Sequence, residues 1–228
     1  MITVHHLNNS RSQRVLWLLE ELALDYEIKR YERDPKTIRA PASLKAVHAL
    51  GKSPVITDGK TTVAESGAII EYLVRRYGEG KFSPEAESKA YLDYTYWLHF
   101  AEGSLMPPMV MRLVFEKVKT SPMPFFVKPI AKQISDKVMK TFVGPEIVSA
   151  LRFTDAYLEG RDWFAGNRLS GADIQMSFPL EAAVARGMVH QENYPNIYRY
   201  VKQFQQRPAY LRALEKGGDY DYGPTEDA

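Results

Sequence analysis

A proline at the start of a predicted strand is the feature that most constrains this chain. The run Gly51-Lys52-Ser53-Pro54-Val55 is typical of a turn that enters a strand. Proline lacks an N–H group, so within sheets it is confined to edges, strand starts and bulges. We therefore expect a special backbone geometry at Pro54, with a cis peptide bond as one candidate.

A predicted helix start follows this proline closely. Glu65-Ser66 precedes a periodic apolar stretch that includes Ile69, Ile70 and Leu73. The first N–H groups of a helix and its dipole attract anions. A strand start and a helix start placed side by side would suit the backbone and carboxylates of a small peptide.

Composition excludes several classes of function. The chain has 228 residues and no cysteine, and its 30 basic and 28 acidic residues leave a net charge of +2. We therefore expect no disulfide, no thiol chemistry from its own side chains, no nucleic-acid partner and no membrane partner. The five histidines lack ligand spacing, so no metal site is expected. The amino terminus lacks a signal-peptide pattern, and the missing cysteines fit a reducing compartment, so we expect a cytoplasmic protein.

Strand and helix periods alternate in the first third of the chain. Asp58-Gly59 lies between two apolar runs, which is a strong hairpin signal. This order predicts a mixed sheet with a helical crossover. The expected elements are a strand over 2–7, a helix over 10–24, a strand over 26–31, an irregular or weakly helical segment over 35–50, a hairpin over 54–63 and a helix over 65–77.

Helical periodicity dominates after residue 85. Pro107-Pro108 predicts a kink in a long aromatic-rich helix over 91–114. Prolines over 122–129 predict a break, after which helices resume over 130–142 and 145–160. Ser170 and Asp173 form a capping-box pattern before another helix. A final helix is expected over 197–206, and the polar tail over 217–228 is expected to be mobile.

These features together resemble the cytosolic glutathione S-transferase superfamily over nearly the whole chain. The matching marks, in chain order, are Ser10, Ser53-Pro54, Glu65-Ser66, the run 96–104 and Ser170-x-x-Asp173. The run 96–104 is similar to a bacterial and fungal branch of serine-type members. The resemblance implies an α/β thioredoxin-like domain over 1–78, a linker over 79–86 and an all-α domain over 87–228. It also implies glutathione as co-substrate and a homodimer.

The resemblance also implies which residue activates the thiol. Tyrosine-type members carry a tyrosine near the end of the first strand, where this chain has the run 5–9, His-His-Leu-Asn-Asn, and cysteine-type members need a cysteine. The resemblance therefore implies Ser10 as the thiol contact and Ser12 as the second candidate, with a simple helix cap as the alternative role of Ser10. Arg11 is either solvated or adds positive field near the sulfur, and Arg14 is expected to be structural.

Five residues are expected to hold glutathione, according to the resemblance. Ser66 and Glu65 would bind the carboxylate and the ammonium of its γ-glutamyl end, although each could be a simple cap. Ser53, kept extended by Pro54, would pair with the cysteinyl backbone. Lys52 would bind the glycyl carboxylate or be an exposed lysine.

Two parts of the expected site are less defined. His48-Ala49 replaces the Asn-Pro that many relatives carry, so the loop near the glycyl end is expected to differ. The pocket for the second substrate is expected between the domains, with Tyr96, His99, Phe100, Met106 and Met109 as candidates. Aromatic and methionine side chains at helical spacing also suit a plain core, and His99 could pair locally with Glu102.

Three functions remain open from the sequence. The first is an enzyme of detoxification that activates glutathione for conjugation to small electrophiles, or for hydroperoxide reduction. The second is a glutathione-binding interaction module of the same fold without turnover. The third is a glutathione-dependent isomerase or dehalogenase, which differs only in the electrophile pocket.

Overall fold

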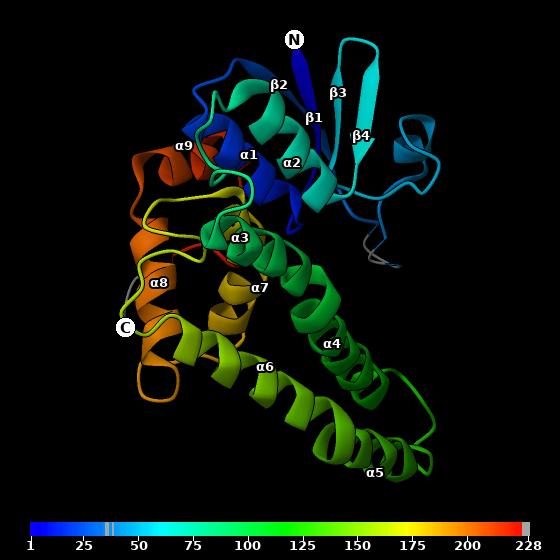
Figure 1. Ribbon diagram of the computed structural model, residues 1–228. Helices are drawn as coiled ribbons and strands as arrows, with labels where there is room; N and C mark the ends of the chain where they lie inside the picture. The colour runs from blue at the N-terminus through cyan, green and yellow to red at the C-terminus, as the bar shows by residue number, and fades with distance from the viewer. Residues whose placement is uncertain (35–36, 38, 225–228) are drawn as a thin grey trace.

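A computed structural model describes residues 1–34, 37 and 39–224, and shows a small sheet domain above a set of long helices (Figure 1). Parts of the predicted segment 35–50 and of the tail, at 35–36, 38 and 225–228, lie outside the described residues. In the sheet domain the elements are β1 (Ile2–Leu7), α1 (Ser12–Glu21), β2 (Tyr26–Tyr31), a 3₁₀ turn (Ala42–Ala46), β3 (Val55–Asp58), β4 (Thr61–Ala64) and α2 (Ser66–Tyr77).

The four strands form a mixed sheet in the order β2-β1-β3-β4. β1 and β2 are parallel, with Ile2 opposite Tyr26, because α1 carries the chain back across the sheet between them. β3 is antiparallel to β1 and to β4. Gly59 in the hairpin turn has φ +58°, a conformation that glycine adopts without steric cost. The predicted thioredoxin-like order of strands and helices is confirmed.

Two backbone features stand at the predicted strand and helix starts. The Ser53-Pro54 peptide bond is cis. Glu65, the residue before α2, has φ 69°, which is uncommon for a residue with a side chain. Residues with this backbone conformation cluster at functional sites, so the Glu65 backbone marks the start of α2 as a candidate site. The first helix is shorter than the prediction of 10–24, because it begins at Ser12 and ends at Glu21.

The remainder of the chain is helical. Its elements are α3 (Lys89–Phe100), a π-helical segment (Ala101–Leu105), α4 (Met106–Thr120), α5 (Lys128–Val138), a second π-helical segment (Met139–Val143), α6 (Gly144–Tyr157), α7 (Gly171–Ala185), α8 (Pro195–Gln205) and α9 (Pro208–Gly217). The structure thus has the predicted sheet domain followed by an all-α part.

Prolines begin helical segments here more often than they break them. The π-helical segment Ala101–Leu105 joins α3 directly to α4, and Pro107 and Pro108 lie in the first turn of α4. Proline fits this position because it has no N–H to donate, and the π turn before it already changes the backbone pairing, with the Met106 N–H bonded to the Ala101 carbonyl. The two prolines predicted to kink this helix thus directly follow a wider π turn. Pro129 likewise lies at the start of α5 and not in a break.

The end of the chain differs from its prediction. Helix α9, begun by Pro208, was not predicted, since the sequence pattern placed the last helix at 197–206. The tail is also not loose over its described part. Asp221 donates its backbone N–H to Asn9 Oδ1 at 2.8 Å, and Asn9 Nδ2 donates to the Asp221 carboxylate at 2.7 Å. Tyr220 donates to Glu181 on α7 at 3.1 Å. Residues 218–224 are thereby tied to the first loop and to α7.

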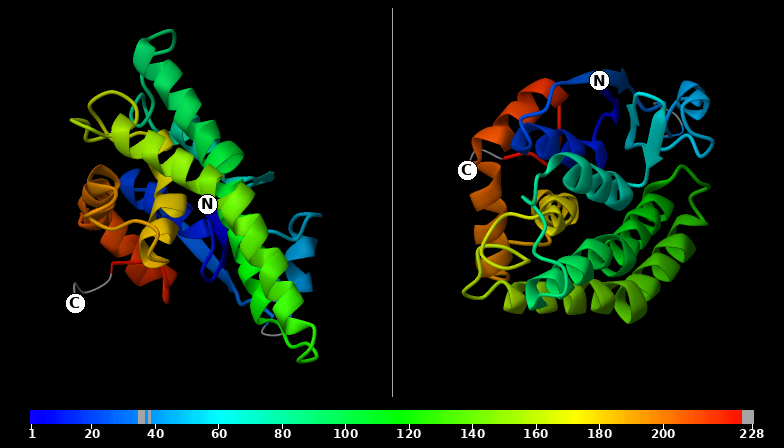
Figure 2. Two further views of the ribbon diagram at one scale, coloured as in Figure 1. Left: turned by 90° about the horizontal axis from the view of Figure 1, so that it is seen from below. Right: turned by 45° about the horizontal axis from the view of Figure 1, so that its top comes forward.

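Helix α7 is the centre of the molecule, as the right-hand view of Figure 2 shows. Every residue from Gly171 to Ala183 is buried, in contacts with α1, α2, α3 and α8. A helix surrounded on all sides has no solvent-facing stripe, so its buried polar groups, such as Asp173 and Glu181, must find their partners within the protein. No helix in the described part of the chain is long and apolar enough to cross a membrane.

The predicted capping box begins this central helix. Asp173 accepts the Ser170 N–H at 2.8 Å and the Ser170 hydroxyl at 2.7 Å. It also accepts the Phe164 N–H at 2.9 Å and the Tyr200 hydroxyl at 3.0 Å. Burial raises the Asp173 pKa to about 6, although these donors act in the opposite direction. The carboxyl group thus joins α7 to the loop before it and to α8.

Candidate functional site

A cavity of about 230 Å³ lies where the sheet domain faces the π-helical segment. All five residues predicted to hold glutathione line it, namely Lys52, Ser53, Pro54, Glu65 and Ser66. The remaining lining residues are Arg11, His48, Leu50, Ala64 and Glu102. Chain segments that are distant in sequence therefore meet at one small polar cavity.

Helix α2 presents its amino terminus to this cavity. Glu65 precedes the helix and is exposed, whereas Ser66 is its first residue and only 4% exposed. The Ser66 hydroxyl accepts a hydrogen bond from Arg14, whose side chain is fully buried. The first N–H groups of α2 point outward without helical partners, so they can receive a carboxylate.

The strand start forms the opposite wall. Pro54 is buried, and the Ser53 hydroxyl donates to the His5 carbonyl at 2.9 Å. Ser53 lies just before β3, which pairs with both β1 and β4 from Val55 onward. Its backbone therefore lies at the end of the sheet, where an extended peptide can continue the pairing. Lys52 is exposed at the edge of the cavity, which His48 also lines.

The two serines predicted to contact the thiol are not among the residues that line this cavity. The Ser10 hydroxyl donates to the Leu7 carbonyl at 2.8 Å and lies 2.8 Å from the Ser12 hydroxyl. Ser12 is fully buried and lies 2.9 Å from His6 Nδ1. A hydroxyl has one proton, so Ser10 must turn away from Leu7 before it can donate to a sulfur atom.

The sequence alone did not predict that Arg11 and Glu102 meet at the cavity. Arg11 Nε lies 2.8 Å from Glu102, and Arg14 Nη2 approaches the same carboxylate at 2.5 Å. Burial alone would raise the pKa of Glu102, but Arg14 and Arg11 hold it below its ordinary value. Glu102 thus pairs with these two arginines and not with His99. Arg14 also donates to the Gln175 carbonyl on α7, so its contacts fit the structural role expected of it.

A larger cleft of about 460 Å³ lies beside the first cavity. Met106 and Met109, two of the predicted electrophile contacts, lie in its wall, and Arg11 lines both spaces. Tyr96, His99 and Phe100 are not among its lining residues. The Tyr96 and Phe100 rings instead stack at 5.8 Å between centroids, on the face of α3 that meets Phe153 of α6.

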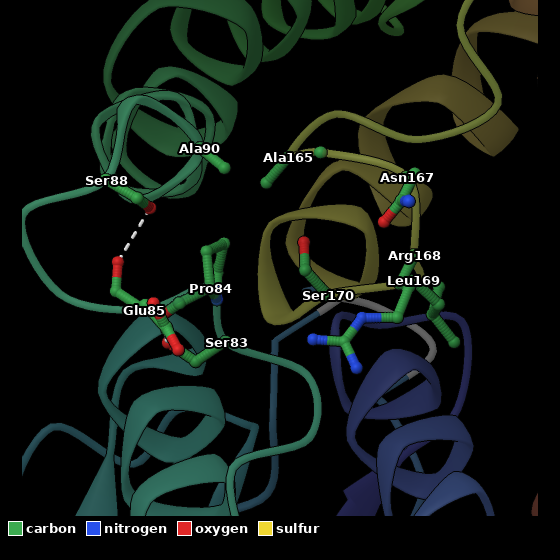
Figure 3. A pocket seen from close by; sticks show the side chains of 11 residues that line it. Ser83, Pro84, Glu85, Ser88, Ala90, Ala165, Asn167, Arg168, Leu169 and Ser170 are labelled. Atoms are coloured by element: carbon green, nitrogen blue, oxygen red, sulfur yellow. Dashed lines mark hydrogen bonds between the residues drawn. The ribbon is translucent and has the colours of Figure 1, made fainter.

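A third cavity, of about 220 Å³, lies away from these two. It is bounded by the segment 83–90 and by the loop 165–170 before α7. In Figure 3 the Arg168 side chain extends from that loop toward Ser83 and Glu85, and the Ser88 hydroxyl donates to the Glu85 carbonyl at 2.7 Å. This cavity shares no lining residue with the polar cavity, so it belongs to the junction between the two parts of the chain.

Two family models match most of the chain. "Glutathione S-transferase, N-terminal domain" matches residues 1–75, and "Glutathione S-transferase, C-terminal domain" matches residues 121–208. The chain belongs to the glutathione S-transferase family. The sheet domain with the polar cavity is therefore the amino-terminal domain of a glutathione S-transferase enzyme.

Proteins similar to this glutathione S-transferase are found in fungi and in bacteria. Glutathione S-transferase 3 of Schizosaccharomyces pombe is 40% identical, over 96% of this chain and 89% of its own length. Glutathione S-transferase 1 of Saccharomyces cerevisiae is 35% identical, over 95% of each chain. The crystal structure of a glutathione S-transferase from Actinobacillus pleuropneumoniae superposes with a TM-score of 0.78 at 37% identity, covering 95% of this chain and 93% of that one.

Proposed function

We propose that this enzyme activates the thiol of glutathione and conjugates it to small electrophiles. The observation that carries the proposal is that the five predicted glutathione contacts line one cavity, which shares Arg11 with an apolar cleft. A tripeptide in the first space would then direct its sulfur toward a reactant in the second. The proposal includes, as a secondary activity of the enzyme, the reduction of hydroperoxides by the same thiol.

In this proposal, charged side chains and helix N–H groups bind the two ends of glutathione, and backbone groups of the protein bind its cysteinyl residue. The γ-glutamyl carboxylate receives the first N–H groups of α2 and the Ser66 hydroxyl, while Glu65 takes the ammonium. The cysteinyl backbone pairs with Ser53 beside cis-Pro54, and Lys52 takes the glycyl carboxylate. These contacts fix the position of the sulfur before the electrophile arrives.

The protein must then favour the thiolate. A free thiol has a pKa of about 8.5, and lowering it by about two units corresponds to about 2.7 kcal/mol. Arg11 lines the cavity and contributes positive field, together with the amino terminus of α1. Ser10 donates its hydroxyl to the sulfur after turning away from Leu7, and Ser12 is the second candidate. The thiolate forms the new carbon–sulfur bond while the electrophile's leaving group departs with its electron pair.

Titration of bound glutathione by thiolate absorbance tests this mechanism. We expect a thiol pKa well below the free value, raised by Ser10→Ala and by Arg11→Gln, with glutathione affinity retained. Ser149→Ala, on the exposed face of α6, is the matched control. An unchanged pKa in Ser10→Ala would remove Ser10 from the mechanism, and Ser12→Ala would be tested next. Tight glutathione binding without turnover of any electrophile would instead favour the interaction module.

The same proposal includes a cytoplasmic homodimer. Its support is a set of exposed apolar side chains along the paired helices α3 to α6, among them Leu92 at 69%, Tyr96 at 47% and Phe153 at 46% exposure. Apolar patches of this kind mark interfaces. Analytical ultracentrifugation of the wild type and of Tyr96→Glu would test it, and a monomeric wild type would refute it.

A further inference from the structure

The larger cleft combines an apolar floor with a cationic rim. Its floor consists of side chains from α4, α7 and the segment after α7, each less than one-tenth exposed, namely Met106, Met109, Phe178, Ala182 and Met188. Such a surface accepts an apolar body, and methionine adapts to its shape. The cleft is about twice the volume of the polar cavity.

Four arginines and one aspartate are the charged residues in the described lining of this cleft. The arginines come from separate segments, with Arg11 before α1, Arg33 after β2, Arg112 on α4 and Arg186 after α7. Asp221 is the single acid, and its carboxylate already receives Asn9 Nδ2 at 2.7 Å. Arg11 and Arg112 are each paired with a glutamate outside the lining, Glu102 and Glu116, which offsets part of their charge. The lining itself still carries more cationic than acidic groups, which favours anionic ligands.

Two of these arginines retain donors for a ligand. Arg186 donates to the Tyr222 hydroxyl at 2.9 Å and lies over that ring at 5.5 Å, and no carboxylate of a described residue lies within 4 Å of it. Arg112 uses its Nε to reach Glu116 at 2.7 Å. A guanidinium group has five N–H donors, so both arginines can still bind a carboxylate.

The position of Arg11 orients a ligand in the cleft. Arg11 is the residue common to the cleft and the polar cavity, so the reacting carbon must lie near it to meet the glutathione sulfur. Arg112 and Arg186 line the cleft but not the polar cavity. A ligand with an electrophilic carbon at one end and an anionic group at the other would satisfy both requirements.

We propose that the electrophile of this enzyme is an apolar molecule that carries a carboxylate or a similar anionic group, bound by Arg112 and Arg186. The inference rests on the proposed function, because it assigns the substrate class of the same site. Hydrogen bonds to charged groups are stronger than those between neutral groups, so we expect about tenfold or greater discrimination in favour of the anion, which corresponds to about 1.4 kcal/mol or more.

A matched pair of substrates tests this assignment. 4-(Bromomethyl)phenylacetate and its methyl ester share the same reactive bromomethyl carbon. In the acid, the aromatic ring and one methylene group separate this carbon from the carboxylate. The glutathione thiolate displaces bromide from either one, forming a carbon–sulfur bond while bromide leaves with the bonding electrons. We expect kcat/KM for the acid to exceed that for the ester by about tenfold or more at low salt, and the ratio to fall as ionic strength rises.

Variants locate the source of the preference. Arg186→Gln and Arg112→Gln should each reduce the acid-to-ester ratio, and the double variant should bring it close to one. Arg152→Gln, on an exposed position of α6, is the control and should retain the wild-type ratio. The ratio is insensitive to general damage, since both substrates use the same thiol. A wild-type ratio of one or below, or a ratio unchanged in the double variant, would overturn the assignment.

Binding measurements separate this inference from the proposed function. Calorimetry with 4-biphenylacetate and its methyl ester needs no turnover. If neither bromide is conjugated, the proposed function fails, and the cleft is judged by binding alone. Tighter binding of the acid, lost in the double variant, would then support the anionic class, whereas equal binding of acid and ester would refute it.

Discussion

Glu181 should make the stability of this enzyme fall as the pH rises through neutrality. The side chain lies on α7, is 2% exposed, and accepts hydrogen bonds from Tyr210, from Tyr220 at 3.1 Å and from Gln205 at 3.4 Å. Burial raises its pKa from 4.5 to about 8, although these donors act in the opposite direction. The folded protein therefore keeps a proton that the unfolded chain releases.

The sign and size of the effect follow from proton linkage. Below pH 4.5 both states are protonated and this group does not affect the balance. Between the two pKa values the unfolded state binds fewer protons, so the free energy of unfolding falls by about 1.4 kcal/mol per pH unit. The loss between pH 6 and pH 8 is about 2 kcal/mol, because the slope decreases near the folded pKa.

The Glu181→Gln variant tests this reasoning. Glutamine has nearly the same shape and its carbonyl can accept the tyrosine hydroxyls, but it does not ionise. Urea unfolding followed by tryptophan fluorescence should show the variant gaining about 2 kcal/mol over the wild type between pH 6 and pH 8. Glu159→Gln, at an exposed position, is the control and should follow the wild type. Parallel pH curves for Glu181→Gln and the wild type would refute a protonated Glu181.

Two further predictions concern the start of α7. Asp173→Ala should lower the free energy of unfolding by about 4 kcal/mol or more, since four buried donors lose their acceptor; a loss below about 1 kcal/mol in thermal unfolding would contradict the role of this carboxyl. Gly171→Ala should destabilise by about 1–3 kcal/mol, because its Cβ would lie 2.8 Å from Ile70 Cγ2 and 2.9 Å from the Tyr94 hydroxyl. The matched control Gly103→Ala meets nothing within 4 Å, so equal melting shifts in both variants would refute the close approach.

Local signals carried the sequence predictions that the structure confirms. The structural roles of Pro54 and Glu65 follow from the residues beside them in the chain. The same holds for the Asp58-Gly59 turn and for the cap at Ser170. Each depends on chemistry within a few residues. The strands, the hairpin, the first helices of the sheet domain and the start of α7 could therefore be predicted from short stretches of the chain.

Contacts between distant segments account for what the sequence missed. Glu102 meets Arg11 and Arg14 across the domain junction, 91 and 88 residues away in the chain. Periodicity shows that Tyr96 and Met106 lie on helices, but it does not show which face turns toward the cleft. The polar, glycine-containing tail predicts mobility, whereas Tyr220 and Tyr222 contact Glu181 and Phe178 of α7. In each case a tertiary contact determined the outcome.

The tie between Asn9 and Asp221 has a consequence for how this enzyme is made. A ribosome delivers the first loop early and Tyr222 more than two hundred residues later, yet both belong to the wall of one cleft. Nascent chains fold in the order in which they emerge. The sheet domain can therefore form its own walls of the polar cavity early in translation. The space for the second reactant is completed only after Asp221 and Tyr222 have been made and have docked.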